Sequence, residues 1–171
     1  MPEVIAQITQ STPTGGQTTY RVIAVTETSL VAQIPVTSQH HYWILPTADL
    51  NDPTTYLPPQ DDPTYNMRQD WIAYREQFNL LQPEEIKAAR KALGLTLREA
   101  ALILGMSFST LSNIENNRLL QSFDHEVKLR YLTKPTWIRT LVRQHRALIV
   151  ARAAQRKIDA ERLLQKLRRT H

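Results

Sequence analysis

The chain has 171 residues, of which 42% are hydrophobic, so it can form one domain or two small ones with packed cores. It has no cysteine, which excludes disulfides, thiolate metal sites and a cysteine nucleophile. The net charge of +5 is unevenly spread: residues 1–82 hold three basic and eight acidic side chains, and the rest hold 18 basic and eight acidic ones. An acidic front and a basic back indicate two functional parts, of which the basic one is attracted to polyanions.

Neither a membrane span nor a secretion signal is visible. No run approaches the roughly 20 consecutive apolar residues that cross a bilayer as a helix. The first residues, MPEVIAQITQ, have neither the basic start nor the apolar core of a signal peptide. We therefore expect a cytoplasmic protein with no membrane partner.

The start of the chain has the composition of β-strands. Three segments are rich in Val, Ile, Thr and Tyr and have the length of a strand. Within them, apolar residues either alternate with polar ones or follow one another, over residues 4–10, 18–26 and 29–36. Gly15 and Gly16 supply the positive φ of a hairpin turn, and the short Glu27-Thr28 link separates the next two strands. A fourth strand is expected over residues 41–45. These segments predict a small antiparallel sheet.

The adjacent His40 and His41 raise the question of a metal site. Successive residues of a strand point to opposite faces, and no other ligand cluster lies nearby in the sequence. We therefore expect no metal ion and no other cofactor.

Residues 46–66 hold five prolines, four aspartates and few apolar groups, which is the composition of a linker. Trp71, Tyr74 and Phe78 then recur at helical spacing. They predict an amphipathic helix whose aromatic stripe is buried.

Two helices flank the stretch that carries most of the functional signal. Pro83 suits the first turn of a helix that Gly94 ends. Another helix is expected over residues 123–132, closed before Pro135.

Residues 96–118, TLREAALILGMSFSTLSNIENNR, predict two short helices joined by a tight turn. Thr96 can cap the first helix while Glu99 reaches back to the cap amide. Gly105 ends that helix because glycine turns left-handed without a steric penalty, and Ser107 caps the second helix. So short a connection makes the helices cross steeply. This is the geometry of a helix-turn-helix whose second helix can lie in the DNA major groove.

The apolar spacing agrees with that interpretation. Ala101 and Leu104 on the first helix, and Leu111 and Ile114 on the second, fall three apart and point to one side. The outer face is mostly short, neutral and hydrogen-bonding, which suits base edges and phosphates. This face holds Phe108, Ser109, Ser112, Asn113 and Asn116. We expect DNA contacts from these residues and from their neighbours Ser107, Thr110 and Arg118. The alternative is an ordinary helical hairpin whose polar face meets only solvent.

The same stretch resembles a known family. From Glu85 to about Leu119 the chain resembles the Xre-type, phage-repressor-like helix-turn-helix domain. The residues that carry this resemblance are Ile86, Arg90, Gly94, Leu95, Thr96, Ala101, Leu104, Gly105, Ser107, Leu111, Ile114, Glu115 and Asn116. A wider stretch, residues 71–135, is similar to the C-terminal half of MqsA-type (YgiT-type) antitoxins, through LLQPEEI at 80–86 and QSFDHEVKLRYL at 121–132.

The resemblance implies roles for individual residues on the outer face of the second helix. Ser107 and Asn116 would contact phosphates. Phe108, Ser109 and Asn113 would face bases.

The resemblance also implies a structural pair, in which Arg90, on the helix that Gly94 ends, binds Glu115 at the end of the recognition helix.

Two residues depart from the family pattern: Leu97 stands where many relatives have a DNA-contacting glutamine, and Asn117 stands where they have glycine. Asparagine tolerates a left-handed backbone, so the second departure is mild. In MqsA-type relatives the N-terminal half is a cysteine-ligated zinc domain, which this cysteine-free chain cannot form.

The end of the chain is basic and helical in character. Residues 136–169 contain no proline or glycine and predict one long helix or two shorter ones, with a break near residues 154–157 where the apolar stripe drifts. Residues 134–171 hold 11 basic and two acidic side chains. This segment either contacts phosphates or forms the solvated basic face of a dimer helix.

We therefore expect an α+β protein with a small N-terminal antiparallel β-sheet domain over residues 1–45. A Pro/Asp-rich linker over 46–66 leads to an all-α helix-turn-helix DNA-binding domain over 67–135. A long basic C-terminal helix follows over 136–171.

The leading hypothesis is a sequence-specific transcriptional repressor of bacterial or phage type. It would bind an inverted repeat in double-stranded DNA as a homodimer, and it would autoregulate its operon as an antitoxin. The alternative is a protein-interaction module whose sheet domain binds a partner such as a toxin, with the helix-turn-helix serving structure. An enzyme is least favoured, because the chain has no Ser-centred glycine elbow, phosphate loop or paired histidine ligands. A membrane-surface role for the basic helix is a further alternative.

Overall fold

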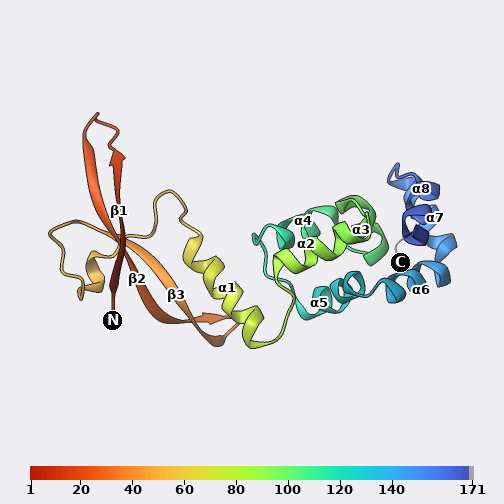
Figure 1. The fold of residues 1–171 in the computed structure, drawn as a ribbon, viewed down its shortest axis with the longest axis horizontal. Coiled ribbons are helices and arrows are strands. Elements are labelled where there is room, and N and C mark those ends of the chain that lie inside the picture. Colours follow the sequence, from red (N-terminus) through yellow and green to blue (C-terminus); the bar gives the residue numbers. More distant parts are fainter. Residues whose placement is uncertain (170–171) are drawn as a thin grey trace. The chain divides into compact units, whose positions relative to one another are not determined.

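A computed structural model describes residues 1–169. The chain forms two compact units, Met1–Phe78 and Asn79–His171. Among the described residues, the first unit contains all the strands and one α-helix, and the second contains only helices (Figure 1). The fold is therefore α+β, as the sequence predicts. The last two residues of the predicted basic helix, Thr170 and His171, lie outside the described residues.

The first unit is built on a three-stranded antiparallel sheet of order β1–β2–β3. The strands are β1 (Glu3–Ser11), β2 (Gln17–Val31) and β3 (Ile34–Ile44). The central strand β2 pairs with both neighbours, with Ile8 opposite Tyr20 and Val25 opposite His40. Gly15 holds a φ of 83° in the turn between β1 and β2, a conformation that glycine adopts without strain.

The second turn of the sheet lies elsewhere than the sequence predicts. The prediction of a turn at Glu27-Thr28 is wrong, because both residues pair with β3 as part of β2. The chain reverses at Ala32 and Gln33 instead, with φ angles of 48° and 66°. Neither is a residue that favours positive φ, so no turn signal marks the site. The predicted fourth strand, residues 41–45, is largely the end of β3.

Helix α1 (Tyr65–Gln77) packs on β3 and belongs to the sheet unit. Its buried residues are the polar Asp70 and Arg75, not the aromatic stripe that its spacing predicts, and Phe78 just beyond it is 42% exposed. The predicted helix-turn-helix domain over 67–135 is therefore too long at its start. The reason is a set of polar contacts that holds α1 to the sheet.

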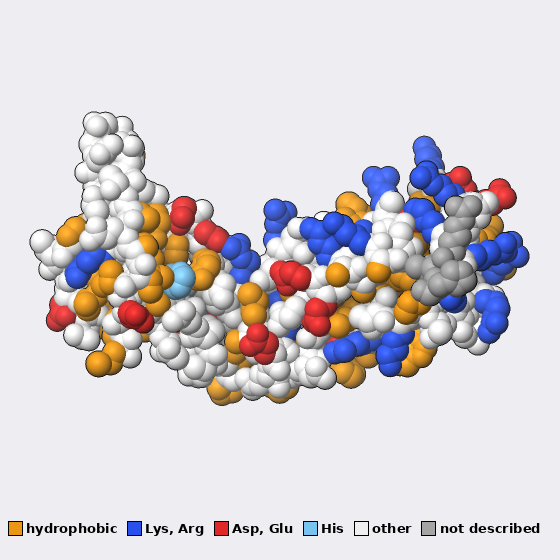
Figure 2. Space-filling view, in the orientation of Figure 1, with side chains coloured by type: hydrophobic (Ala, Val, Ile, Leu, Met, Phe, Trp, Pro, Cys, Tyr) orange, Lys and Arg blue, Asp and Glu red, His pale blue; other side chains and the backbone are white. Residues whose placement is uncertain are grey.

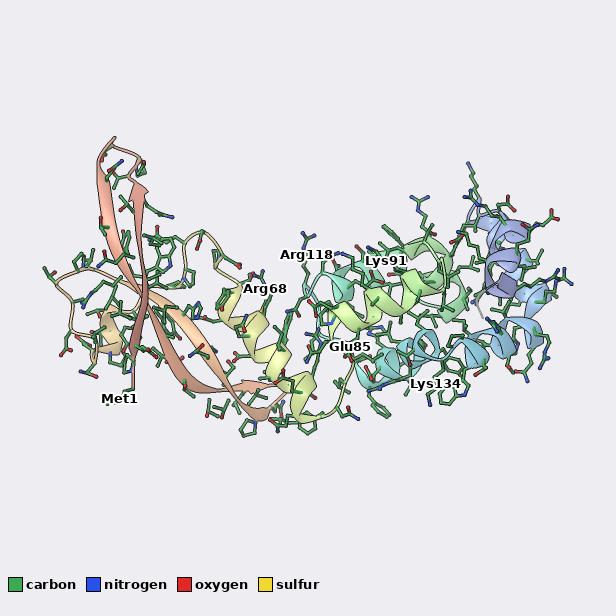
Figure 3. The ribbon with its side chains drawn as sticks, in the orientation of Figure 1. Met1, Arg68, Glu85, Lys91, Arg118 and Lys134 are labelled. Carbon is green, nitrogen blue, oxygen red and sulfur yellow. The ribbon has the colours of Figure 1, made fainter. Side chains whose placement is uncertain are left out.

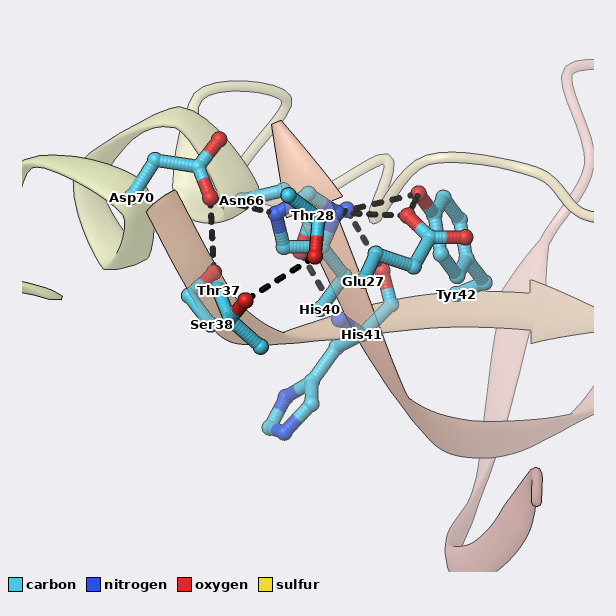
Figure 4. Close-up of polar contacts among 9 residues, drawn as sticks. All are labelled: Glu27, Thr28, Thr37, Ser38, His40, His41, Tyr42, Asn66 and Asp70. Carbon is cyan, nitrogen blue, oxygen red and sulfur yellow. Dashed lines mark hydrogen bonds and ion pairs between the residues drawn. The ribbon is translucent and has the colours of Figure 1, made fainter. Parts of the chain in front are cut away.

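These contacts centre on His40 of β3, which lies between Glu27 of β2 and Asp70 of α1 (Figure 4). Its Nδ1 is 2.8 Å from Glu27 Oε2, and its Nε2 is 2.8 Å from Asp70 Oδ1. Ser38 donates to the same Asp70 oxygen, and the Tyr42 hydroxyl donates to Glu27, both at 2.6 Å. Burial, helped by Glu27, raises the pKa of Tyr42. Among the residues that the structure describes, no group of three or more His, Cys, Asp or Glu side chains is arranged to hold a metal ion.

The Pro/Asp-rich segment, residues 46–66, does not separate the two units. Trp43 and Leu57 exchange backbone hydrogen bonds of 2.8 and 2.9 Å, which pair this segment with the end of β3. A short 3-10 helix, Pro53–Thr55, lies just before Leu57. The boundary between the units falls after Phe78 instead.

The helices of the second unit share one hydrophobic core. They are α2 (Pro83–Ala92), α3 (Leu97–Leu104), α4 (Phe108–Glu115), α5 (Phe123–Leu129), a 3-10 helix (Arg130–Thr133), α6 (Pro135–Gln144), α7 (Arg146–Gln155) and α8 (Ala160–Arg169). Ile86, Leu102, Leu129, Ile138 and Leu163 are each at most 1% exposed. The core thus draws on α2, α3, α5, α6 and α8.

The basic C-terminal segment forms three helices, whereas the sequence predicts one long helix or two shorter ones. His145 leaves the helical conformation, with a φ of −112°, and separates α6 from α7. Helix α7 ends at Gln155, which confirms the break predicted near residues 154–157, and Lys157, with a φ of 55°, turns the chain into α8. Leu163 and Leu167 of α8 are 0% and 4% exposed. Short helices fold back and bury these residues, which one straight helix would leave in water.

A buried carboxylate ties the start of the second unit to α5. Glu126, which is 4% exposed, accepts hydrogen bonds of 3.2 Å at both oxygens from the Leu81 backbone N–H. It also accepts a 2.6 Å bond from Arg130 Nε, while Gln121 donates to the Leu81 carbonyl at 2.6 Å. Because these buried groups satisfy one another, they fix the chain ahead of α2.

The turn at Gln33 gives a stability prediction. Gln33→Gly should raise the free energy of unfolding by about 0.5 to 1 kcal/mol, because glycine adopts positive φ without the steric penalty. Urea unfolding followed by tryptophan fluorescence measures it, since Trp43 and Trp71 both lie in the unit that contains the sheet. Gln39→Gly, at an extended position in β3, is the control and should lower stability by a similar amount. If both variants lose stability equally, Gln33 does not have the positive φ that we assign to it in the turn between β2 and β3.

Candidate nucleic-acid interface

Helices α3 and α4 are joined by a turn of three residues, Gly105 to Ser107. Thr96 Oγ1 accepts a hydrogen bond from Glu99 N at 3.2 Å, and Glu99 Oε2 accepts one from Thr96 N at 2.7 Å. Gly105 ends α3 with a φ of 65°, and Ser107 Oγ accepts from Thr110 N at 3.0 Å. The caps and the turn predicted from the sequence are confirmed.

The faces that α3 and α4 turn toward the core are apolar and buried. Ala101, Leu111 and Ile114 are 0% exposed and Leu104 is 5% exposed. The small side chain of Ala101 lets α4 approach α3 closely. The spacing that predicts one buried side on each helix is confirmed.

The other side of α3 is buried as well. Leu102 and Ile103 are 1% and 7% exposed, and α3 packs against α7. The C-terminal helices therefore cover the back of the helix-turn-helix and bring their basic side chains near it.

Arg90 of α2 and Glu115 of α4 form a buried two-bond pair. Arg90 Nε lies 2.7 Å from Glu115 Oε1, and Arg90 Nη2 lies 2.8 Å from Glu115 Oε2. Arg90 Nη1 also donates to the Leu95 carbonyl at 2.8 Å. Their side chains are 9% and 2% exposed. One guanidinium thus joins α2, the chain before α3, and the end of α4.

The residues predicted to meet DNA lie together on the outer side of α4 and at its two ends. The exposed ones are Ser107, Phe108, Ser109, Asn116 and Arg118, and the partly buried ones are Thr110, Ser112 and Asn113. Asn116 Nδ2 donates to the Ser112 carbonyl at 2.7 Å, and the Ser107 hydroxyl lies 2.7 Å from that of Thr110. These bonds orient the polar groups at the two ends of the helix.

The two departures from the family pattern have structural explanations. Leu97 is partly buried against the hydrophobic core, where many members of the family that it resembles have a glutamine. Asn117 has a φ of 51°, the left-handed conformation for which glycine is used elsewhere. Asparagine is one of the few other residues that adopt it readily.

Three arginines near the start of α4 were not predicted as part of the site. Arg98 of α3 and Arg156 after α7 line a recess of about 400 Å³ together with Ser107 and Phe108. The Arg98 guanidinium lies over the Phe108 ring, 5.6 Å from its centroid. A Cβ added at Gly105 would lie 3.8 Å from Arg152 Nη1. The sequence shows that Arg152 and Arg156 share a helix face, but only the tertiary fold brings them to the turn.

A second ion pair links the end of the chain to α3. Lys166 Nζ of α8 lies 2.8 and 2.7 Å from the two oxygens of Glu99, the residue that also caps α3. Burial by itself would raise the pKa of Glu99, but the hydrogen bonds from Lys166 and Thr96 outweigh it and lower that pKa. The carboxylate is therefore held ionised at the start of α3.

Lysine and arginine side chains spread widely over the second unit (Figure 2). In the view of Figure 3, Lys91 and Arg118 project from the same side of this unit, whereas Lys134 lies on the opposite side. Such a surface attracts polyanions.

Comparison with known families agrees with this geometry. Residues 86–124 match the family model described as Helix-turn-helix, which covers less than a quarter of the chain. No curated protein and no solved structure matches the chain. The matched segment is similar to the Xre-like helix-turn-helix of DNA-binding transcription regulators. Within the described residues, no helix is long and apolar enough to cross a membrane.

The buried pair gives a second stability prediction. Glu115→Ala should lower the free energy of unfolding by about 3 to 5 kcal/mol, because Arg90 would be left as an uncompensated buried charge. Thermal melts measure the loss. The control is Glu84→Ala, which removes an exposed carboxylate from the first turn of α2 and should cost less than about 1 kcal/mol. Equal melting temperatures for Glu115→Ala and wild type would contradict the pair.

Proposed function

We propose that the protein is a sequence-specific transcriptional repressor that reads double-stranded DNA with helix α4. The observation that carries this proposal is the mostly neutral, hydrogen-bonding outer face of α4, held in position by the buried Arg90–Glu115 pair within a matched helix-turn-helix. A helix on such a motif is presented to the major groove, where base edges offer a distinct pattern of donors and acceptors.

Different residues of this face suit different parts of DNA. Asn113 can form two hydrogen bonds with an adenine edge, and Ser109 and Phe108 lie in the first turn of α4, where base contact is expected. Ser107 and Asn116 lie at the two ends of the helix and suit phosphates, which fix the register but carry no sequence information. Arg118, also exposed, would add a charged phosphate contact.

The bound form would be a homodimer on an inverted repeat. One recognition helix covers only a few base pairs, so two of them must reach successive major grooves, about 34 Å apart on one side of the duplex. The most direct experiment is a gel-shift titration on the DNA upstream of the protein's own gene, at stated salt. A complex that resists non-specific competitor DNA supports the proposal, and the absence of one overturns it.

A second candidate function is binding of a protein partner through the sheet unit, with the whole protein acting as an autoregulating antitoxin. The edge strand β1 favours it. Only one of its two edges is paired within the described residues, and Val4 and Ile5 are 42% and 46% exposed. A partner strand can add to such an edge. Co-purification of the full chain with the product of a neighbouring small gene tests it, with Ile5→Lys expected to abolish the complex and Gln7→Lys, in the same strand, as the control for added charge.

Base and phosphate contacts should separate in mutant binding. Asn113→Ala should weaken binding to the cognate site by about 1 to 3 kcal/mol and barely affect random DNA, because its contact is to a base. Asn116→Ala should weaken binding to both DNAs alike. Fluorescence anisotropy on both DNAs measures this, and equal losses for the two variants on both DNAs would contradict base reading by α4.

The arginines beside the turn should contribute affinity without specificity. Replacing Arg152 and Arg156 by Gln should reduce the slope of log affinity against log salt by about one for each phosphate that the variant no longer neutralises. Lys134→Gln is the control and should leave the slope unchanged, because Lys134 lies on the other side of this unit from Lys91 and Arg118 in Figure 3. An unchanged slope in the double variant, together with a monomeric protein, would mean that this segment dimerises rather than binds phosphates.

A further inference from the structure

The C-terminal helices form a half-open cavity of about 370 Å³ that shares no lining residue with the helix-turn-helix recess. Val142 of α6 and Leu164 and Leu167 of α8 form its apolar lining. Its volume falls within the range of small-ligand sites, which are mostly apolar with a few polar groups that fix orientation.

The polar groups that the described residues bring to this cavity are all arginines. They are Arg139 and Arg143 of α6, Arg146 of α7 and Arg168 of α8. No described acidic side chain lines the cavity, and none of the four arginines forms an ion pair with another described residue. Four like charges around one space repel one another, so a negative group between them is favoured, above all beside Arg139, which is the one partly buried member of the four.

Arg139, in the lining of this cavity, has a hydrogen-bond donor without a described acceptor. Its Nε donates to the Leu167 carbonyl at 2.9 Å. Its Nη2 is buried and has no hydrogen-bond partner among the described residues. A buried charged donor without an acceptor is costly, and an anion bound beside Arg139 would offset that cost.

We propose that this cavity binds a small organic anion with an apolar body, such as a carboxylate, sulfonate or phosphate attached to an aliphatic or aromatic group. The arginines would hold the anionic head and the Val and Leu side chains the body. A DNA phosphate would use the arginines but not the apolar lining, so nucleic acid fits the cavity less well. This proposal does not depend on DNA binding by α4.

Binding there would also reach the helix-turn-helix. Helix α8 lines the cavity on one side and carries Lys166, which pairs with Glu99 at the start of α3. A ligand that bridges α6 and α8 stabilises the arrangement in which that pair forms.

Calorimetric titration of the full chain with 2-naphthoate tests the proposal, and naphthalene-2-carboxamide and inorganic phosphate are the comparison ligands. The carboxamide keeps the apolar body without the charge, and phosphate keeps the charge without the body. We expect saturable binding of 2-naphthoate with a Kd on the order of 0.1 to 1 mM, and binding at least about tenfold weaker for the other two. The variant with Arg143→Gln and Arg168→Gln should lose about tenfold in affinity. Arg162→Gln, also exposed on α8 but outside the cavity, should bind like wild type.

Thermal melts show whether each variant is folded and whether it binds the ligand. We expect 2-naphthoate to raise the melting temperature of wild type and of Arg162→Gln but not of the double variant. No saturable binding, equal binding of the carboxamide, or an equal loss in Arg162→Gln would each overturn the proposal. Vesicles containing phosphatidylglycerol form a further arm. If they bind through Arg143 and Arg168 while 2-naphthoate does not bind, these arginines meet lipid headgroups and the small-ligand site is wrong.

Discussion

The buried pair of Arg90 and Glu115 is the interaction on which the geometry of the helical unit depends. Helix α4 has eight residues, and a helix so short is not stable in water by itself. Its first turn is set by the cap at Ser107, and its last residue is held to α2 by two hydrogen bonds from Arg90. The same guanidinium binds the Leu95 carbonyl, so it also fixes the chain that leads into α3. The direction of the outer face of α4 follows from these constraints.

The charges of the unit divide into those that hold the fold and those that remain for a partner. Arg90 and Lys166 are paired with Glu115 and Glu99, and both pairs join elements far apart in the sequence. Around the turn and around the C-terminal cavity, by contrast, arginines lie without an ion pair to any described residue. Cations gathered without counter-charges destabilise the free protein slightly and favour anion binding. This division explains how a chain with a modest net charge can present strongly basic surfaces.

The sequence predicts features whose cause is local and misses those whose cause is distant. The cap at Thr96 and the left-handed Gly105 depend on neighbouring residues, and both are where the pattern indicates. The turn at Gln33 is missed because the pairing of β2 with β3, not the turn residue, decides it. The assignment of α1 to the sheet depends on Asp70 meeting His40, which lies 30 positions earlier. The approach of Arg152 to the turn at Gly105 likewise arises only from packing of α7 on α3.

Methylation protection of a bound cognate site tests the central claim, that α4 lies in the major groove, most directly. Dimethyl sulfate modifies guanine N7 in the major groove and adenine N3 in the minor groove, so the two grooves are read separately. The account predicts protection of guanine N7 in two successive major grooves, about 10 base pairs apart on one side of the duplex. Protection confined to adenine N3, or uniform weak protection along the duplex, would contradict it.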